Sequence, residues 1–390
     1  MFRHTTGWNR RLYVLIRACA ALCLAVLGLA VASGAPAAAQ GVPDRAGLPA
    51  GARPLSTARA HGSSVRRDTE TIKYWSGSFT YQDTTYPFTM VGTDPAAGSK
   101  TTSVPMKLIP VRLVFADGTV LDGSSKAGLT IQSPMFQATD VGAGTGGAAP
   151  HDVTQVADAI QRAEFANYVS TTSPGYHVLL GGPALLATQT LHVPTDKGFV
   201  VQDSAGENIG LVDIDWFDAQ LVQLMSALHI KAVTVPIFLT NNTVLYIQNP
   251  NNCCVFGYHN ALGSTSPSGK QQVQTYIFSS YLTEHVFGTA NLADIDGLSH
   301  EVSEWMNDPF VNNVVPPWSV PSQPQYGCTA VLETGDPLVS VAFALTMPNG
   351  VTYHPQDEAF LPWFARQVPS TSYHGHYTYL ATFADVSPPC

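Results

Sequence analysis

The residues best suited to chemistry lie in one segment, residues 294–309, which reads Asp-Ile-Asp-Gly-Leu-Ser-His-Glu-Val-Ser-Glu-Trp-Met-Asn-Asp-Pro. At about 100° per residue, its apolar side chains fall on one side of a helix and its polar side chains on the other. His300 and Glu304 are one turn apart on the polar side, so both could reach one ion, and Glu301 adjoins them. Pro309 is expected to end the helix.

The spacing of these residues matches the geometry of the zinc-peptidase helix His-Glu-x-x-His. In that helix two ligands stand at i and i+4, and the intervening Glu acts as a base on a metal-bound water. Here Glu304 takes the place of the second histidine, and a site with one imidazole and several carboxylates accepts calcium or manganese better than a bis-imidazole site does. The alternative is a solvated face of an amphipathic helix, where His300 and the carboxylates contact only water.

Further segments give the chain a resemblance to known secreted proteins. Residues 299–304 and Asp308-Pro309 are followed by Glu333-Thr334-Gly335-Asp336. Together they resemble the pattern His-Glu-x-x-Glu…Asp-Pro…Glu-x-Gly-Asp of exordium-like (phosphate-induced) proteins, and of exported bacterial and fungal proteins that look like distant zincin-type metallopeptidases. Residues 254–259 are similar to a Cys-Gly-(aromatic)-His stretch upstream of the helix in those proteins. The likeness covers residues 232–366, about a third of the chain.

The resemblance implies a role for each matching residue. His300 and Glu304 would be metal ligands, Glu301 the general base, and Glu333 the third ligand from a separate segment. Asp308 and Asp336 would be either further ligands or groups that orient His300.

Several of these residues also have ordinary structural interpretations. Glu333 and Asp336 could form a simple turn around Gly335, and His259 could be a hydrogen-bonded structural histidine. His354 is a reserve ligand, ranked below Glu333. Its segment could equally be a loop entering a short helix that packs aromatic side chains into the core.

The first forty residues predict export. Arginines precede an apolar run from Ala18 to Ala32, and Ala37-Ala38-Ala39 supplies a small-residue cleavage site. The run is shorter than the ~20 residues that span a bilayer, so residues 1–39 are expected to be a cleaved signal peptide without a membrane anchor. Arg10-Arg11 leaves a twin-arginine signal as an alternative to the general secretory route. Residues 40–67 have the composition of a disordered leader.

Charge and cysteine content narrow the function classes. The chain has 19 Lys and Arg against 28 Asp and Glu, and signal cleavage would remove arginines but no acids. Such an acidic body does not suit a polyanion partner, so nucleic-acid binding is the function least expected. Cys253, Cys254, Cys328 and Cys390 remain after cleavage and are expected to form two disulfides. The adjacent pair is expected to bond to two distant partners.

The succession of elements predicts the α+β class and not a regular βαβ array. Residues 68–150 are expected to be a β-rich portion. Residues 151–390 are expected to form a mixed α/β, zincin-like portion that carries the metal-site helix. Two helices are expected before that one: the first from Asp152 to about residue 168, the second around residues 217–228 with Asp213 or Asp215 as its cap. Strands are expected at 71–81, 86–91, 104–115, 232–239, 243–247 and 271–278, with a hairpin around Asn241-Asn242.

These observations favour a secreted or periplasmic metal-dependent hydrolase, peptidase-like, in which a metal-activated water attacks a peptide carbonyl. Zinc is the expected cofactor, with calcium or manganese as alternatives, and a peptide or protein is the expected substrate. No nucleic acid and, after signal cleavage, no membrane is expected as a partner; the oligomeric state is open. The alternative is a non-catalytic secreted or cell-wall-associated protein with a structural calcium site or an interaction role. Carbohydrate processing would be favoured if aromatics near Tyr326 and Trp363 lined an open groove.

Overall fold

The computed structural model describes residues 69–203, 205–266, 268–320 and 328–390. The predicted signal peptide and the leader, together residues 1–67, lie outside the described residues. Strand residues outnumber helical residues in a mixed architecture, which agrees with the predicted α+β class. Within the described ranges, no helix is both long enough and apolar enough to cross a membrane.

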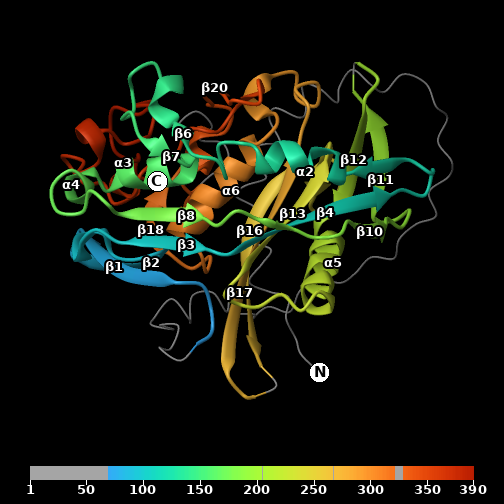
Figure 1. The fold of residues 1–390 in the computed structure, drawn as a ribbon, viewed down its shortest axis with the longest axis horizontal. Helices are drawn as coiled ribbons and strands as arrows, with labels where there is room; N and C mark the ends of the chain where they lie inside the picture. Colours follow the sequence, from blue (N-terminus) through green and yellow to red (C-terminus); the bar gives the residue numbers. More distant parts are fainter. Residues whose placement is uncertain (1–68, 204, 267, 321–327) are drawn as a thin grey trace.

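The core of the fold is a seven-stranded mixed sheet (Figure 1). Along its main path the strands follow the order β10 (Gln189–His192), β4 (Met106–Val114), β13 (Val235–Asn241), β17 (Gln271–Tyr281) and β16 (Gly257–Thr265). Two short strands also pair with β4: β5 (Val120–Asp122) and β9 (Ala184–Leu185). The central strands β4, β13 and β17 are parallel, whereas β16 runs antiparallel to β17. In Figure 1, β16 and β17 extend as a ribbon beyond the other strands.

The two faces of this sheet carry two separate hydrophobic cores, because successive residues of a strand point to opposite sides. Ile237 of β13 belongs to the core that contains Leu298 and Trp305 of α6 (Asp296–Asn307), together with residues of α3 (Val156–Glu164). Its neighbour Phe238 belongs to the core that contains Phe217 of α5 (Ile214–Ala227). The sheet therefore separates α6 from α5, and the apolar stripe of α6 fixes which of its sides faces the strands.

The helices test the capping predictions. Helix α5 begins as expected at Asp213, whose side chain accepts a hydrogen bond from the Trp216 amide at 2.9 Å. Helix α6 lies within the expected segment and ends before Pro309. The prediction that Asp152 caps a helix is wrong, because β7 (Val153–Thr154) follows it and α3 begins only at Val156. Asp152 instead forms an ion pair with Arg162 at 2.5 Å, near the end of α3.

A second sheet of four strands lies beside the first. Its order is β11 (Gly198–Gln202), β12 (Asn208–Asp213), β14 (Thr243–Tyr246) and β15 (Cys253–Val255). The expected hairpin around Asn241-Asn242 is wrong, because β13 and β14 belong to different sheets. Both strands are almost wholly buried, so each needs partners on both edges, and the chain turns at Asn242 to pass from one sheet to the other.

Short paired strands and small helices complete the fold. The pairs are β1 (Tyr74–Tyr81) with β2 (Thr84–Val91), β3 (Thr101–Val104) with β8 (His177–Leu180), β6 (Thr139–Asp140) with β7, β18 (Val314–Trp318) with β19 (Thr329–Val331), and β20 (Leu345–Thr346) with β21 (Thr352–Tyr353). The remaining α-helices of the described residues are α2 (Ser124–Ile131), α4 (Ala166–Val169) and α7 (Leu361–Phe364).

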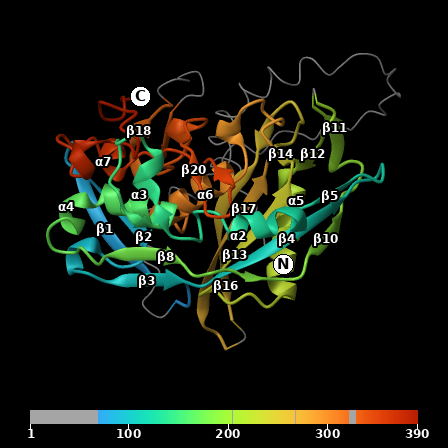
Figure 2. The same cartoon turned by 45° about the horizontal axis from the view of Figure 1, so that its top comes forward.

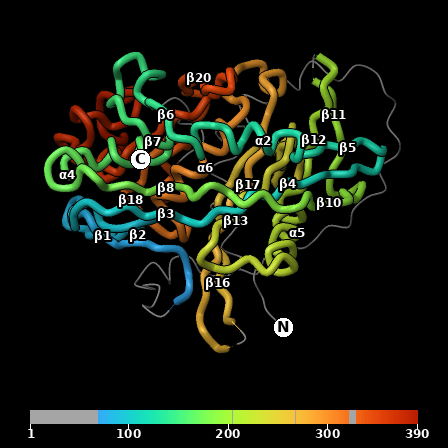
Figure 3. The backbone as a smooth tube through the Cα atoms, viewed as in Figure 1, coloured from blue at the N-terminus to red at the C-terminus, as the bar shows by residue number. Residues whose placement is uncertain are grey.

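Segments from the two ends of the described chain pack together. Phe88 of β2 shares a core with Trp318 of β18 and Trp363 of α7. Figures 2 and 3 show β1 and β2 next to β18 and the C-terminal segments. In addition, β4 from the β-rich portion pairs with β13 from the later portion. The two portions expected from the sequence thus share one sheet and one core.

The four described cysteines form two disulfides, Cys253 with Cys254 and Cys328 with Cys390. The expectation that the adjacent pair bonds to distant partners is wrong. Cys253 and Cys254 are buried in β15, while Cys328 lies beside β19 and bonds to the last residue of the chain. The spacing of the cysteines in the sequence does not predict the bond between Cys328 and Cys390, because the fold alone brings these two residues together.

Candidate metal centre

Helix α6 is buried over its whole length, on its polar side as well as on its apolar side. His300 is 5% exposed, Glu301 2% and Glu304 0%. The solvated helix face considered from the sequence is therefore wrong. Segments that follow α6 in the chain fold over that face. The backbone amide of Gly335 donates to Glu304 Oε1 at 3.1 Å, and the backbone amide of Gln356 donates to Ser299 Oγ at 2.9 Å.

The ring of His300 is held through one nitrogen, and its other nitrogen faces the carboxylates. Its Nδ1 lies 3.1 Å from Gln356 Oε1. The side-chain amide of Gln356 is itself held in place, because its Nε2 donates to the carbonyl oxygen of Gly335 at 2.7 Å. Its Oε1 is therefore free to act as an acceptor for His300. In the neutral ring the proton therefore sits on Nδ1, and Nε2, which has no hydrogen-bond partner, keeps its lone pair for a ligand.

Three buried side chains converge on this nitrogen. Glu304 Oε1 lies 3.1 Å and Asp336 Oδ1 3.7 Å from His300 Nε2. One ligand atom from each of the three side chains fits within 4.8 Å of the other two. Neither oxygen of Asp336 nor Glu304 Oε2 has a hydrogen-bond partner. Buried polar atoms are nearly always satisfied, so this first group has the donor set that a cation would complete.

A second group adjoins the first and shares Glu304 with it. His259 on β16 directs its Nδ1 to Glu301 Oε2 at 3.3 Å and to Glu304 Oε2 at 3.7 Å. The three side chains also place ligand atoms within 4.8 Å of one another, and all three are buried. His259, which the sequence favoured as a structural histidine, thus lies among potential ligands and makes a hydrogen bond to one of them.

The structure separates the remaining predicted ligands. Glu333 is buried, and the charge of Glu304 acts on it, but it belongs to neither group. Asp308 ends α6 and accepts hydrogen bonds from the backbone amides of Asn312 at 2.8 Å and Asn313 at 3.0 Å. Asp308 therefore holds the turn after the helix, and its charge raises the pKa of Glu333 and of His259.

Two further sequence-derived candidates lie outside both groups. His354, the reserve ligand, forms an ion pair with Asp294 at 2.7 Å. Trp363 is 1% exposed and stacks among core aromatics, so it lines no open groove, and Tyr326 lies outside the described residues. The observation that would have favoured carbohydrate processing is thus not met at Trp363.

Sequence reasoning missed two residues that the fold brings to the centre. Gln356 orients His300, and Glu358 is fully buried near His300 and Glu304, whose charges act on it. The one available signal was the polar run Gln356-Asp357-Glu358 in front of an apolar segment, because carboxyl groups rarely enter a core without a partner.

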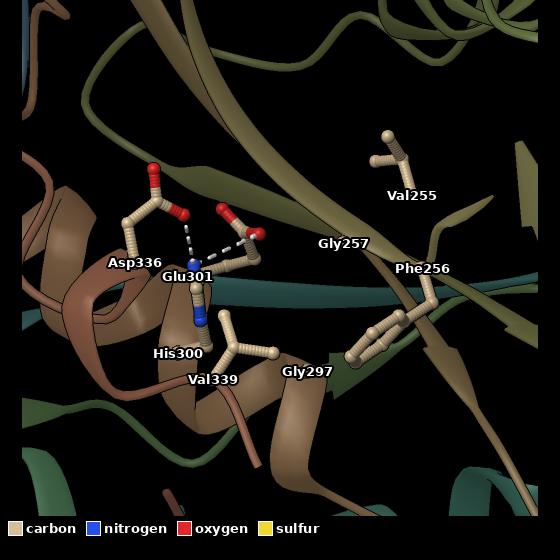
Figure 4. Close-up of a pocket in the computed structure, with 8 residues that line it drawn as sticks. All are labelled: Val255, Phe256, Gly257, Gly297, His300, Glu301, Asp336 and Val339. Carbon is tan, nitrogen blue, oxygen red and sulfur yellow. Dashed lines mark ion pairs between the residues drawn. The ribbon is translucent and has the colours of Figure 1, made fainter. Parts of the chain in front are cut away.

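A small pocket opens onto the first group (Figure 4). Its volume of about 20 Å³ is enough for a water molecule. Figure 4 shows His300, Glu301 and Asp336 directed toward one another on one side of it, while Phe256 and Val339 contribute apolar atoms. A water there would lie beside the ligand atoms and beside the Glu301 carboxylate.

Burial and mutual charge shift the protonation of the whole cluster. Burial, joined by the charge of Glu304, raises the pKa of Glu333 and of Asp336 well above their ordinary values. Burial alone would lower the pKa of His300, but the facing carboxylates of Glu304 and Glu301 outweigh it and raise that pKa well above its ordinary value. For Glu304 the opposing charge of His300 outweighs burial and lowers the pKa. Without a cation, therefore, the cluster is neutralised by retained protons.

Gly335 is the position where the site tolerates no side chain. A Cβ there would lie 2.5 Å from His300 Nδ1, and the Gly335 amide is tied to Glu304. We expect Gly335→Ala to push the imidazole off Gln356 and to weaken divalent-cation binding about 10–100-fold, as other changes to groups that orient metal ligands do. Isothermal titration calorimetry with Zn²⁺ measures this loss. Gly128→Ala, on helix α2 with open space around the added Cβ, is the control, and equal affinities for both variants would contradict the packing described.

Comparisons of the chain with protein-family models, with curated proteins and with solved structures found no match.

Proposed function

We propose that this protein is an exported metal-dependent hydrolase of the peptidase type, built around a divalent cation held by His300, Glu304 and Asp336. One observation carries the proposal: His300 Nε2 and both Asp336 oxygens are buried without hydrogen-bond partners, and His300, Glu304 and Asp336 each place one ligand atom within 4.8 Å of the other two. A buried donor or acceptor left unsatisfied costs about 1–3 kcal/mol, and more if it is charged. A cation bound by these atoms would remove that cost.

The donor set suits zinc or manganese. One imidazole nitrogen and two carboxylates form the first group, a combination that several first-row divalent metals accept, whereas calcium prefers oxygen ligands alone. The resemblance implied Glu333 as the third ligand, but Glu333 belongs to neither group, and the charge of Glu304 acts on it. Asp336, whose Oδ1 lies 3.7 Å from His300 Nε2, is the third ligand in our proposal. The resemblance to zincin-type metallopeptidases supports the same helix as the centre.

Glu301 is the residue that we assign as the general base. Its Oε1 lies 3.9 Å from His300 Nε2 and borders the pocket. Burial raises its pKa, partly offset by the hydrogen bond to His259 and the charge of His300. A carboxylate with a raised pKa is well matched to accept a proton near neutral pH. A bound cation would polarise the scissile carbonyl and a water; Glu301 would take a proton from that water and return one to the leaving amine.

Chelation tests this proposal. The purified protein is incubated with a mixture of internally quenched peptides, with and without EDTA, and then resupplied with Zn²⁺ or Mn²⁺. We expect cleavage that EDTA abolishes and that one of the two cations restores. Cleavage that persists undiminished in EDTA would overturn the metal-dependent assignment.

A structural cation is the second candidate, favoured by the burial of the site. Glu304 and Asp336 are 0% exposed, so their ligand atoms lie inside the fold. In that case the cation would hold the segment around Gly335 to α6. The chain would then be a non-catalytic secreted protein, the alternative that accompanies its resemblance to exordium-like proteins. Loss of stability on chelation without any cleavage of peptides would favour this candidate.

The pKa shifts predict how stability depends on pH. The raised pKa values of Glu333, Asp336 and His300 mean that the folded, cation-free protein binds more protons than the unfolded chain. Its stability is then fully present below the unfolded carboxyl values, near 3.8 to 4.5, and is lost as pH rises through the folded values. Within the cluster, Glu304 has the opposite sign, because its pKa is lowered.

We therefore expect the melting temperature in EDTA to fall as pH is raised above about 4.5. A bound cation displaces the retained protons, so saturating Zn²⁺ should reduce or reverse this fall. Thermal unfolding followed by circular dichroism at a series of pH values measures both curves. A chelated protein that gains stability over the same range would contradict the shifts described.

A further inference from the structure

The carboxylates of α6 divide their oxygens between two histidines. Glu304 presents Oε1 to His300 Nε2 at 3.1 Å and Oε2 to His259 Nδ1 at 3.7 Å. Glu301 presents Oε2 to His259 Nδ1 at 3.3 Å, while its Oε1 points to the pocket side, 3.9 Å from His300 Nε2. A single cation on His300 would leave the His259 side of this arrangement unused.

The second group has an unpaired ligand atom of its own. Glu304 Oε2 has no hydrogen-bond partner although the residue is 0% exposed, and this is the oxygen that faces His259. His259 is 6% exposed and enters from β16, whereas Asp336 comes from the short 3-10 helix Asp336–Leu338. Histidine and carboxylate ligands therefore approach Glu304 from two sides, and both sets of three satisfy the spacing of a cation site.

We propose that the site is a two-cation centre in which Glu304 bridges the ions: His300 and Asp336 complete the first position, His259 and Glu301 Oε2 the second. In two-metal sites the ions stand about 3.5–4 Å apart, a span that one carboxylate bridges. Glu301 Oε1 stays directed to the pocket, so the same residue can ligate through one oxygen and accept a proton on the other. This inference rests on the cation centre of the proposed function, but not on any hydrolytic activity.

Stoichiometry and magnetic coupling test the inference. The purified protein is stripped with a chelator, dialysed against Mn²⁺ or Zn²⁺, and the bound metal is measured by elemental mass spectrometry. The number of ions per chain is taken from whichever metal, Mn²⁺ or Zn²⁺, binds in the larger amount. We expect about two ions per chain in the wild type and about one in His259→Gln. His354→Gln, which removes a histidine paired with Asp294 outside both groups, is the matched control and should keep two.

Electron paramagnetic resonance of the Mn²⁺-loaded wild type gives a second readout that depends on no variant. Two bridged Mn²⁺ ions give a spin-coupled spectrum, and a single ion gives an isolated six-line signal. One ion per chain with an uncoupled spectrum, and no change in His259→Gln, would overturn the two-cation centre while leaving the proposed first site in place. No bound ion of either metal would overturn both.

Discussion

Glu301→Gln is expected to reduce peptide hydrolysis by a factor of about 10²–10⁴, the range that a positioned general base contributes. The substitution keeps the size and shape of the side chain but removes its ability to accept a proton. The fold and the first cation position should survive, because His300, Glu304 and Asp336 are untouched. The measurement is kcat/KM on a cleavable peptide, beside the melting temperature and the metal content of the same sample.

The matched control for this change is Glu284→Gln, an exposed glutamate outside the centre, which should leave kcat/KM unchanged. If Glu301→Gln hydrolyses peptide as fast as the wild type, Glu301 is not the base. The structural cation would then be the better account of the site.

Trp305→Ala is expected to lower the free energy of unfolding by about 3–5 kcal/mol, the range for removal of a large buried aromatic side chain. Trp305 is 0% exposed on the apolar side of α6, and its indole Nε1 donates to Thr275 Oγ1 of β17 at 3.1 Å. The substitution would remove both the packing and the hydrogen bond that hold α6 on the sheet. Urea unfolding measures the loss, and cation affinity should fall with it, since α6 carries the shared ligand Glu304.

Tyr168→Ala is the comparison for this prediction, since Tyr168 is 37% exposed and truncating it should have a far smaller effect. A Trp305→Ala variant with a free energy of unfolding within about 1 kcal/mol of the wild type would contradict the packing of α6 against the sheet. It would also remove the reason to regard that helix as the rigid support of the centre.

The helix and its polar triad could be predicted because they are local. The period of 3.6 residues places His300, Glu301 and Glu304 together whatever the rest of the chain does. The same holds for α5, whose cap was predicted to be Asp213 or Asp215 and is Asp213. Predictions of this kind need only a few neighbouring residues, but they can still be wrong: Asp152, also expected to cap a helix, precedes β7 instead.

What surrounds the triad could not be predicted, because it depends on contacts between distant segments. Sequence periodicity shows that one side of α6 is polar, but not that Gly335 and Gln356 cover it. Asp336 was considered as either a ligand or a group that orients His300, and only its position 3.7 Å from the imidazole favours ligation. His259 comes from an edge strand whose place beside the helix is fixed by the pairing of β16 with β17.

The errors have the same origin. The hairpin around Asn241-Asn242 follows turn chemistry that is correct locally, yet the buried strands on either side find their partners in separate sheets. The predicted cysteine pairing is wrong because neighbouring residues were not expected to bond to each other, as Cys253 and Cys254 do.

Metal analysis of the purified protein tests the central claim most directly. Wild type, His300→Ala and the control His354→Ala are compared by elemental mass spectrometry at matched concentrations. A buried cation centre predicts zinc or manganese at one or more ions per chain in the wild type and the control, with a clear loss in His300→Ala. No metal in any of the three, or a metal content that His300→Ala leaves unchanged, would contradict the centre.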